Sequence, residues 1–199
     1  NFTMSGNYLN SRLIGDYVYT IVSETVYTSN GNANLPTIFS GTQTSNVAAS
    51  QIFFVPTPDS YYTYTTVVCI NLKDSSQAAT KTTIMMGGSS EMYVSAGNIY
   101  ILSSDWTRSQ TTTNIYRISI NGTSVALQAK GSVPGTPINQ YAMDEYNGYF
   151  RIATTTWFQD NATTSDGAVF QVSRQQNSIY VLNADMKVVG KLERFKMDE

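Results

Sequence analysis

A strand–turn–strand pattern that occurs three times limits the fold of this sequence more than any other feature. The stretches LIGDYVYTIVSE, SAGNIYILSSDW and EYNGYFRIATTTW each place a glycine-containing turn dipeptide ahead of a run of β-branched and aromatic residues. Such runs fit a pleated surface, and Gly and Asn tolerate the positive φ that tight hairpin turns require. The sequence therefore predicts two-residue hairpin turns at Gly15-Asp16, Gly97-Asn98 and Asn147-Gly148.

A second pair of strands follows each of these hairpins. The runs TTVVCINLKD, TNIYRISING and NSIYVLNADM are typical of third strands that end in polar turns, and TKTTIMM, SVALQAK and KVVGKLERF are typical of fourth strands. Each unit is thus strand, tight turn, strand, variable loop, strand, tight turn, strand. We predict one domain over residues 1–199, with units at approximately 7–87, 88–135 and 136–197 and a long loop insertion at 25–66.

The second strand of each unit is apolar on both of its faces. In IYILSS, Ile99 and Ile101 point to one side and Tyr100 and Leu102 to the other, because successive side chains of a strand alternate. A strand of this kind must be covered on both sides. Antiparallel four-stranded units packed face to face, repeating at about fifty residues, are typical of propeller blades. We therefore predict an all-β fold, a β-propeller portion of about three four-stranded antiparallel blades, with a β-sandwich as the runner-up.

Closed propellers contain about four to eight blades, more than the three predicted here. We expect this chain to be a portion of a longer propeller, in which NFTMSG is the outer strand of a preceding blade. The alternative is self-association of copies through their open blade faces, because an exposed blade face is a large apolar patch.

Four longer motifs carry a family resemblance: SRLIGDYVY (11–19), EMYVSAGNIYILSSDW (91–106), INQYAMDEYNGYFRIATT (138–155) and SIYVLNADMKVVGKLE (178–193). They resemble exported bacterial and archaeal proteins with a C-terminal β-propeller domain distantly related to WD-repeat propellers. The resemblance covers nearly the whole chain, and the third motif is its most specific part. It implies a secreted or surface-attached propeller that continues with more blades, and it supplies no catalytic residues. The insertion at 25–66 departs from the family pattern.

The charge of the sequence excludes some partners. Charged residues make up 13% of the chain, against about 25% in an average soluble domain. Twelve basic and fourteen acidic residues give a net charge of −2 without a basic patch, so nucleic acid is not an expected partner. No apolar run approaches the roughly 20 residues of a membrane span. The single cysteine, Cys69, lies in the apolar run TTVVCINL, where we expect an inert buried thiol.

Three sequons of the N-x-[ST] type, at Asn1, Asn121 and Asn161, are candidate glycosylation sites. Together with the low charge and the many hydroxyl residues, they favour an exported protein that is extracellular or at the cell surface. The N-terminal stretch NFTMSGNYLN lacks the features of a signal peptide. We therefore expect that a signal was removed or that these residues come from within a longer protein.

Two tryptophans occupy equivalent places in the second and third units. Trp106 and Trp157 each follow a turn glycine by nine residues, where the second strand enters its variable loop. Such loops gather on one face of a propeller, where two tryptophans could stack on sugar rings or hold a peptide. The interpretation that we favour is that each indole fills the gap between adjacent blades. The candidate ligand-binding residues are Trp106, Arg108, Trp157 and Phe158, with the segments 25–66 and 157–177 on the same face.

No pattern in the sequence predicts a catalytic, metal or cofactor site. Asp144 and Glu145 are adjacent on a strand and point to opposite faces, so we expect one to lie beside the Asn-Gly turn and the other to meet a neighbouring blade. The stretch DNATTSD at 160–166 lacks the EF-hand spacing and is expected to be a solvated loop. Histidine is absent, which removes His-based triads and zinc sites.

The predicted function is therefore non-enzymatic. We expect an exported or cell-surface propeller region that acts as a binding or adhesion scaffold for a glycan or protein through its variable-loop face. Two alternatives stay open. The first is an extracellular hydrolase or lyase whose carboxylates lie partly in blades outside this sequence, and the second is a passive structural module of the cell surface.

Overall fold

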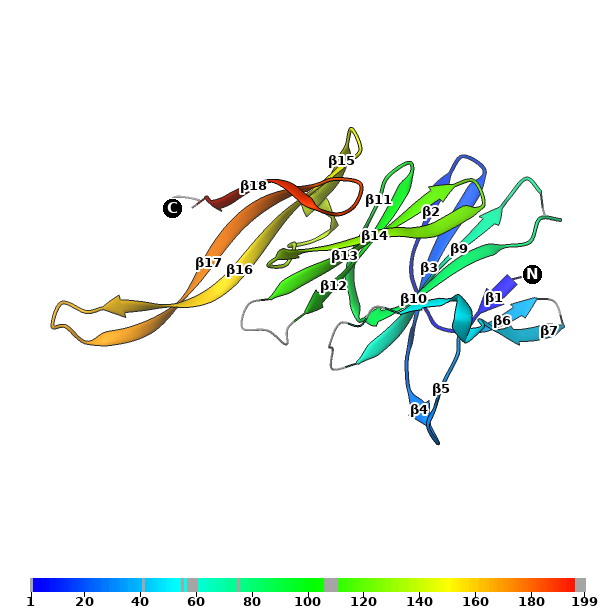
Figure 1. Ribbon diagram of the computed structural model, residues 1–199, viewed down its shortest axis with the longest axis horizontal. Helices are drawn as coiled ribbons and strands as arrows, with labels where there is room; N and C mark the ends of the chain where they lie inside the picture. Colours follow the sequence, from blue (N-terminus) through cyan, green and yellow to red (C-terminus); the bar gives the residue numbers. More distant parts are fainter. Residues whose placement is uncertain are drawn as a thin grey trace.

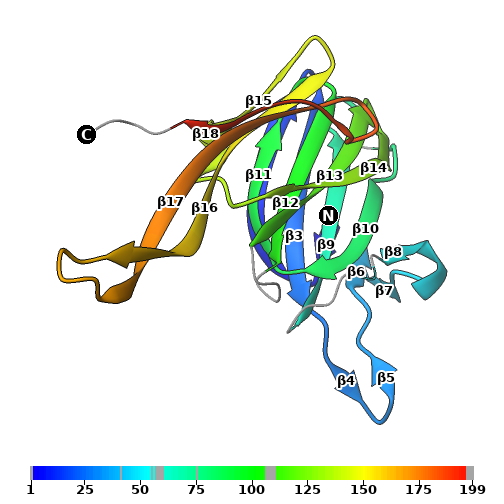
Figure 2. The same cartoon turned by 60° about the vertical axis from the view of Figure 1, so that its left-hand side comes forward.

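Three β-sheets stacked face to face form the body of the protein (Figures 1 and 2). The computed structural model describes residues 2–40, 42–54, 56, 61–74, 76–105 and 111–195. Within these residues, helical structure is limited to two short 3₁₀ turns, η1 (Ala49–Gln51) and η2 (Gln140–Ala142). The prediction of an all-β fold is confirmed.

Each sheet contains four antiparallel strands in up-and-down order. The first sheet consists of β2 (Asn7–Ile14), β3 (Tyr17–Thr25), β9 (Tyr62–Asn71) and β10 (Thr80–Gly87). The second consists of β11 (Ser89–Val94), β12 (Asn98–Asp105), β13 (Thr112–Asn121) and β14 (Ser124–Pro134). The third consists of β15 (Met143–Tyr146), β16 (Tyr149–Thr163), β17 (Val169–Leu182) and β18 (Val188–Phe195). Antiparallel four-stranded units of the predicted kind are thus present.

Two of the three predicted hairpin turns have the expected geometry. Between β15 and β16, Tyr146 pairs with Tyr149, and both residues between them have positive φ: 50° at Asn147 and 76° at Gly148. The β2–β3 turn also has two residues, with φ of 58° at Gly15.

The third turn prediction, Gly97-Asn98, is wrong. Asn98 is the first residue of β12, and the loop consists of residues 95–97. The Ser95 side chain explains the difference, because its Oγ accepts a hydrogen bond from the Asn98 N–H at 3.0 Å. The Ser95 N–H donates in turn to the Asn98 carbonyl at 2.9 Å, which closes the loop one residue earlier than predicted.

Two separate apolar layers lie between the three sheets. The first layer contains Tyr19, Ile21, Val67, Cys69, Ile84 and Met86 of the first sheet against Ile99, Ile101, Tyr116, Ile118 and Ile120 of the second. The second layer contains Tyr100, Leu102, Ile115 and Val133 of the second sheet against Met143, Phe150, Ile152, Tyr180, Leu182 and Met186 of the third. Burying each large side chain contributes about 1.5–3 kcal/mol.

The strand β12 is covered on both faces, as its sequence predicts. Ile99 and Ile101 belong to the first layer, whereas Tyr100 and Leu102 belong to the second, and all four are 0–1% exposed. A β-sandwich would instead enclose one shared core between two sheets. The stacked arrangement therefore excludes the β-sandwich and agrees with propeller blades.

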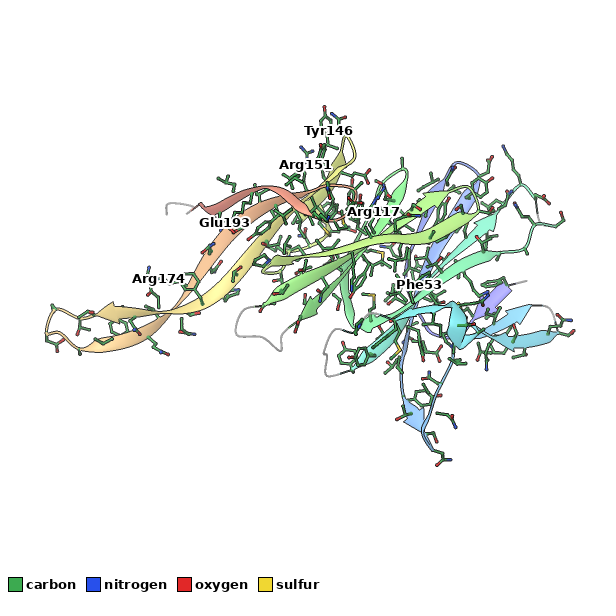
Figure 3. The ribbon with its side chains drawn as sticks, viewed as in Figure 1. Phe53, Arg117, Tyr146, Arg151, Arg174 and Glu193 are labelled. Atoms are coloured by element: carbon green, nitrogen blue, oxygen red, sulfur yellow. The ribbon has the colours of Figure 1, made fainter. Side chains whose placement is uncertain are left out.

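The turn between the third and fourth strands of each later sheet packs against the sheet before it. In the second sheet, the Gly122 carbonyl accepts hydrogen bonds from the Tyr19 hydroxyl at 2.7 Å and from Cys69 Sγ at 3.3 Å. In the third sheet, the Ala184 carbonyl accepts from the Arg117 guanidinium at 2.9 Å (Figure 3). Met186, which follows in the same turn, is 3% exposed and belongs to the second layer.

The insertion after β3 contains strands of its own. These are β4 (Thr28–Ser29), β5 (Asn32–Ala33), β6 (Thr37–Ser40), β7 (Gln43–Asn46) and β8 (Ile52–Phe54). The β4–β5 hairpin projects from the body in both views (Figures 1 and 2), and β8 pairs in parallel with β10. The first sheet thereby gains a fifth strand at its outer edge.

The expectation that NFTMSG forms the outer strand of a preceding blade is wrong within this structure. The strand β1 (Phe2–Met4) pairs with β6, in a small sheet with β7. Two hydrogen bonds of 2.8 Å secure this position, because the Ser5 N–H donates to the Thr37 carbonyl and Ser5 Oγ accepts from the Thr37 N–H. The insertion therefore provides the edge to which the start of the chain binds.

The outer faces of the first and third sheets carry exposed apolar side chains. Tyr8 and Leu13 on β2 are each 64% exposed, and they pair with β3 residues on the face turned away from the second sheet. On the third sheet, Tyr149 and Leu192 are 46% and 57% exposed. Self-association through these faces stays a prediction.

Candidate ligand-binding surface

The third sheet continues beyond the body as a two-stranded arm, residues 157–176, which extends away from the stacked sheets in both views (Figures 1 and 2). The flanking strands do not follow it. The β15 pairing with β16 ends at Ile152, and the β18 pairing with β17 begins at Asn177. Among the described residues, the arm thus has no neighbouring strand on either edge.

The arm replaces the variable loop expected at 157–177, so that expectation is wrong. Strand pairing runs from Trp157↔Gln175 to Thr163↔Val169, and only residues 164–168 form a turn. The Thr164 N–H donates to the Ala168 carbonyl at 2.9 Å, and Asp166 Oδ1 accepts from the Ala168 N–H at 3.3 Å. Alternating aromatic, β-branched and polar residues on both sides of the turn explain why this segment pairs as strands.

Directly opposed residues of an antiparallel pair share a face, so the pairing divides the side chains of the arm into two sets. The amide face carries Trp157, Gln159, Asn161, Thr163, Val169, Gln171, Ser173 and Gln175. The phenyl face carries Phe158, Asp160, Ala162, Phe170, Val172 and Arg174. The first set contains no charged residue, whereas the second contains one acid and one base.

Of the four predicted ligand-binding residues, Trp157 and Phe158 lie on the arm. Trp157 is 58% exposed and Phe158 is 41% exposed, and they point to opposite faces. Trp157 does not lie between two of the three sheets, because β16 has already left the stacked sheets at that position, and its role as a plug against a further blade stays a prediction. Trp106 and Arg108 lie outside the described residues.

The acidic residues of the arm are satisfied by local partners. Arg174 Nε forms an ion pair with Asp160 Oδ2 at 2.9 Å (Figure 3 labels Arg174). Asp166 lies in the turn, where a hydrogen bond from the Thr164 hydroxyl lowers the pKa of its carboxyl. The described residues hold no group of three or more His, Cys, Asp or Glu side chains able to hold a metal ion.

Sequence reasoning missed the β17 half of the arm. Phe170 is 47% exposed on the phenyl face, and Gln175 lies opposite Trp157 on the amide face. The signal that could have found them is the Asp166-Gly167 dipeptide, a hairpin turn signature between two runs of strand-forming residues. Gly167 adopts a φ of 86° there.

The pair Asp144-Glu145 has the structural roles that the strand geometry predicts. Glu145 meets the second sheet, where its carboxylate accepts hydrogen bonds from Ser95 Oγ at 2.7 Å and from the Tyr100 hydroxyl at 2.8 Å. The Asn98 amide also donates to it, at 3.0 Å. Asp144 points the other way and pairs with Arg151 beside the Asn-Gly turn.

Burial and hydrogen bonding keep the buried tyrosine of this cluster protonated. Tyr100 is 1% exposed and stacks on Phe150, with ring centroids 4.1 Å apart. Burial, and then the hydrogen bond to Glu145, raise the pKa of Tyr100 far above its usual value. The cluster is therefore a contact between the second and third sheets.

A cavity of about 330 Å³ lies near the first strands of the sheets. It is lined by Arg12 of β2, by Met92, Tyr93 and Val94 of β11, by Gln140 and Tyr141 of η2, and by Met143 of β15. No carboxylate lines this cavity. The convergence of acids that a hydrolase requires is thus not found in it.

The single thiol is buried, as expected. Cys69 is 0% exposed, and its Sγ donates to the Gly122 carbonyl. Burial raises the pKa of this thiol, which makes it a poor nucleophile.

Two of the three sequons lie at exposed positions. Asn121 is exposed at the end of β13, and Asn161 is exposed on the amide face of the arm. Asn1 lies outside the described residues. Both described acceptor residues are therefore open to a modifying enzyme.

Stacked four-stranded antiparallel sheets in up-and-down order define a protein of the β-propeller class. The family model described as "Beta propeller domain" matches residues 1–199. The chain belongs to this family.

Two archaeal relatives match parts of the chain. An uncharacterized protein of Archaeoglobus fulgidus is 40% identical over 78 residues, which are 38% of this chain and 10% of that protein. The uncharacterized protein MJ1554 of Methanocaldococcus jannaschii is 39% identical over 90 residues, which are 44% of this chain and 12% of that protein. The chain spans only about a tenth of the length of these curated relatives. No solved structure matches it. A search of the described residues found no helix long and apolar enough to cross a membrane.

Proposed function

We propose that this chain is a non-enzymatic β-propeller region of an exported or cell-surface protein, and that its arm is a ligand-binding surface for a glycan or a protein. The observation that carries the proposal is the arm itself. A two-stranded ribbon without further strands is marginally stable in water. The arm nevertheless exposes Trp157, Phe158 and Phe170 to solvent, and such exposed aromatic side chains are common at binding surfaces.

The location of the arm supports the same function. It projects from the connection between the second and third strands of its sheet, and the β4–β5 hairpin projects from the corresponding connection of the first sheet (Figure 1). The stacked sheets provide the base from which both projections extend. Variable segments on a rigid scaffold are the usual place for recognition.

The test is to shorten the arm without disturbing the sheet. Thr156 pairs with Gln176, so replacing residues 157–175 by Asn-Gly leaves a two-residue hairpin in the same register. The intact chain and this variant are applied to an array of printed oligosaccharides and to a phage-displayed peptide library. We expect the intact chain to select ligands in at least one collection and the variant to lose them with an unchanged melting temperature. Absence of ligands in both collections, or equal binding by the shortened variant, would overturn the proposal.

The proposed export is supported by the exposed acceptor residues of two sequons, Asn121 and Asn161. Mass spectrometry of the native protein from the cell-surface and secreted fractions tests it. Recovery of the native protein in the intracellular fraction alone would contradict export.

A further inference from the structure

The two faces of the arm differ in chemistry, and the difference indicates what each can bind. The amide face has one large aromatic side chain, Trp157, six amide or hydroxyl side chains and the exposed apolar side chain of Val169. Among the described residues, neither the indole nor any of the six amide and hydroxyl side chains takes part in a hydrogen bond, so their donors and acceptors are open to a ligand. The phenyl face has two exposed phenyl rings and an internal ion pair.

We infer that the amide face binds a neutral oligosaccharide. This inference rests on the proposed function, because it assigns the ligand class of the same arm. The indole of Trp157 is 58% exposed and offers a flat apolar surface to the C–H side of a sugar ring. Gln175 lies directly opposite Trp157, and Gln159 lies two residues further along the same strand face. Amides both donate and accept, which matches the hydroxyl groups around a sugar ring.

The absence of charge on the amide face decides between neutral and acidic glycans. A uronate or a sulfated sugar is held best by Arg or Lys, and the one cation among the side chains of the two faces, Arg174, lies on the phenyl face. That guanidinium is already paired with Asp160 at 2.9 Å. A ligand on the amide face therefore has only uncharged groups to bond.

The length of the amide face favours a chain of sugars over a single ring. Residues on one face of a strand repeat every second position, at about 3.4 Å per residue, so Trp157 and Asn161 are separated by about 14 Å along β16. This length accommodates several sugar units. Asn161 also belongs to a sequon, so an N-linked glycan at this position would cover the same face, and the test uses unglycosylated protein.

The experiment compares variants of the two faces on one array. The array carries neutral gluco-, manno-, galacto- and N-acetylglucosamine oligosaccharides of four to six units, together with uronate-containing and sulfated oligosaccharides. The variants of the 199-residue chain are Trp157→Ala, the double variant Gln159→Ala/Gln175→Ala and the opposite-face variant Phe158→Ala, with Leu13→Ala on the outer face of the first sheet as the control. Circular dichroism and thermal unfolding establish that each variant is folded. Binding constants for the strongest ligands are then measured by calorimetry.

We expect neutral ligands for the intact chain, binding at least tenfold weaker for both amide-face variants, a smaller loss for Phe158→Ala and unchanged binding for Leu13→Ala. Preferential binding of acidic oligosaccharides, or a loss of binding in Phe158→Ala alone, overturns the inference. If no oligosaccharide binds but phage-displayed peptides bind and lose affinity in Phe158→Ala, the glycan inference fails while the proposed binding function stands. If neither collection yields a ligand, both fail.

Discussion

The two interfaces between successive sheets use the same structural positions but different polar chemistry. In each, the turn between the third and fourth strands of the later sheet presents a backbone carbonyl to the sheet before it: Gly122 in the first interface and Ala184 in the second. The first carbonyl accepts from neutral groups, including the Tyr19 hydroxyl, whereas the second accepts from the Arg117 guanidinium. In the second interface, the carboxylate of Glu145 also accepts from several donors.

This difference shows that stacking depends on position and apolar packing more than on any one polar interaction. Both layers consist mainly of aliphatic and aromatic side chains from facing strands. Their polar contacts differ at the turns, although both interfaces also contain a threonine hydroxyl that donates to a backbone carbonyl of the neighbouring sheet: Thr82 to Val125 and Thr154 to Pro134. A buried charged group, however, costs more to leave unpaired than a neutral one. The second interface should therefore be the more sensitive to single substitutions.

The largest expected effect comes from the closest contact of the second interface. A Cβ at Gly131 of β14 would lie 2.1 Å from the Met186 carbonyl oxygen, a distance that requires the backbone to move. We expect Gly131→Ala to lower the free energy of unfolding by about 3 kcal/mol, as overpacking of a core does. The control is Gly97→Ala, where no atom lies within 4 Å of the added Cβ. Equal urea midpoints for the two variants would contradict the packing of the Met186 turn on β14.

The second prediction concerns the cluster of hydrogen-bond donors around the Glu145 carboxylate. Glu145→Gln keeps the size of the side chain but removes the negative charge that accepts from Ser95, Asn98 and Tyr100. We expect a loss of about 2 kcal/mol in the free energy of unfolding, because at least one buried donor is left without an acceptor. Urea denaturation of both proteins measures it. A stability unchanged by this substitution would mean that the two interfaces do not differ in the way described.

The third prediction concerns the first interface, where the Gly122 carbonyl accepts hydrogen bonds from neutral groups. Tyr19→Phe removes one hydroxyl hydrogen bond to Gly122, and we expect a loss of about 1 kcal/mol at neutral pH. Burial, with smaller effects from Cys69, raises the pKa of Tyr19 to about 12. The unfolded chain therefore loses this proton first, near its ordinary pKa of 10.0, and stability falls as pH rises from about 10 through about 12.

Thermal unfolding between pH 8 and 11.5 measures this alkaline loss. We expect the fall in melting temperature above pH 10 to be smaller in Tyr19→Phe than in the unsubstituted protein. Identical pH profiles would show that the Tyr19 hydroxyl is solvated in the folded protein.

The smallest expected effect is at Asp144, next to Glu145 but on the opposite face. The ion pair with Arg151 lies on the exposed surface, with side chains 50% and 44% exposed, and such pairs contribute little. We expect Asp144→Asn to leave the urea midpoint within experimental error at pH 7. The hydrogen bond from Arg151 lowers the pKa of Asp144, so its small contribution is present above the ordinary pKa of 3.8 and is lost as pH falls below it. A loss equal to that of Glu145→Gln would contradict the comparison.

The sheets could be predicted from the sequence because the pattern of apolar residues along a strand indicates which of its faces are buried. The alternation of Ile99, Tyr100, Ile101 and Leu102 required cover on both faces, and the structure provides it from two different sheets. The insertion could not be predicted, since β1 pairs with β6 more than thirty residues away. Such pairing depends on which edge is free in the folded protein, and no local pattern records it.

The candidate surface was predicted only in part. The spacing of Trp157 from its turn glycine predicted a place at the end of the second strand, whereas β16 extends to Thr163, and the structure exposes the side chain. The spacing did not show that β16 continues past this point, because the polar residues that follow are equally typical of a loop and of a solvated strand. The role of Gln175 depends on its register opposite Trp157, which became known only from the pairing of β16 with β17.

The turn between the third and fourth strands of each later sheet contacts the sheet before it, and this contact has a consequence for folding during synthesis. A ribosome releases the N-terminal sheet first, so the surface that receives the Gly122 turn is complete before that turn emerges. The residues that form the surface for Ala184 and Met186 are likewise synthesised before the third sheet. The order of synthesis therefore allows the three sheets to assemble one after another.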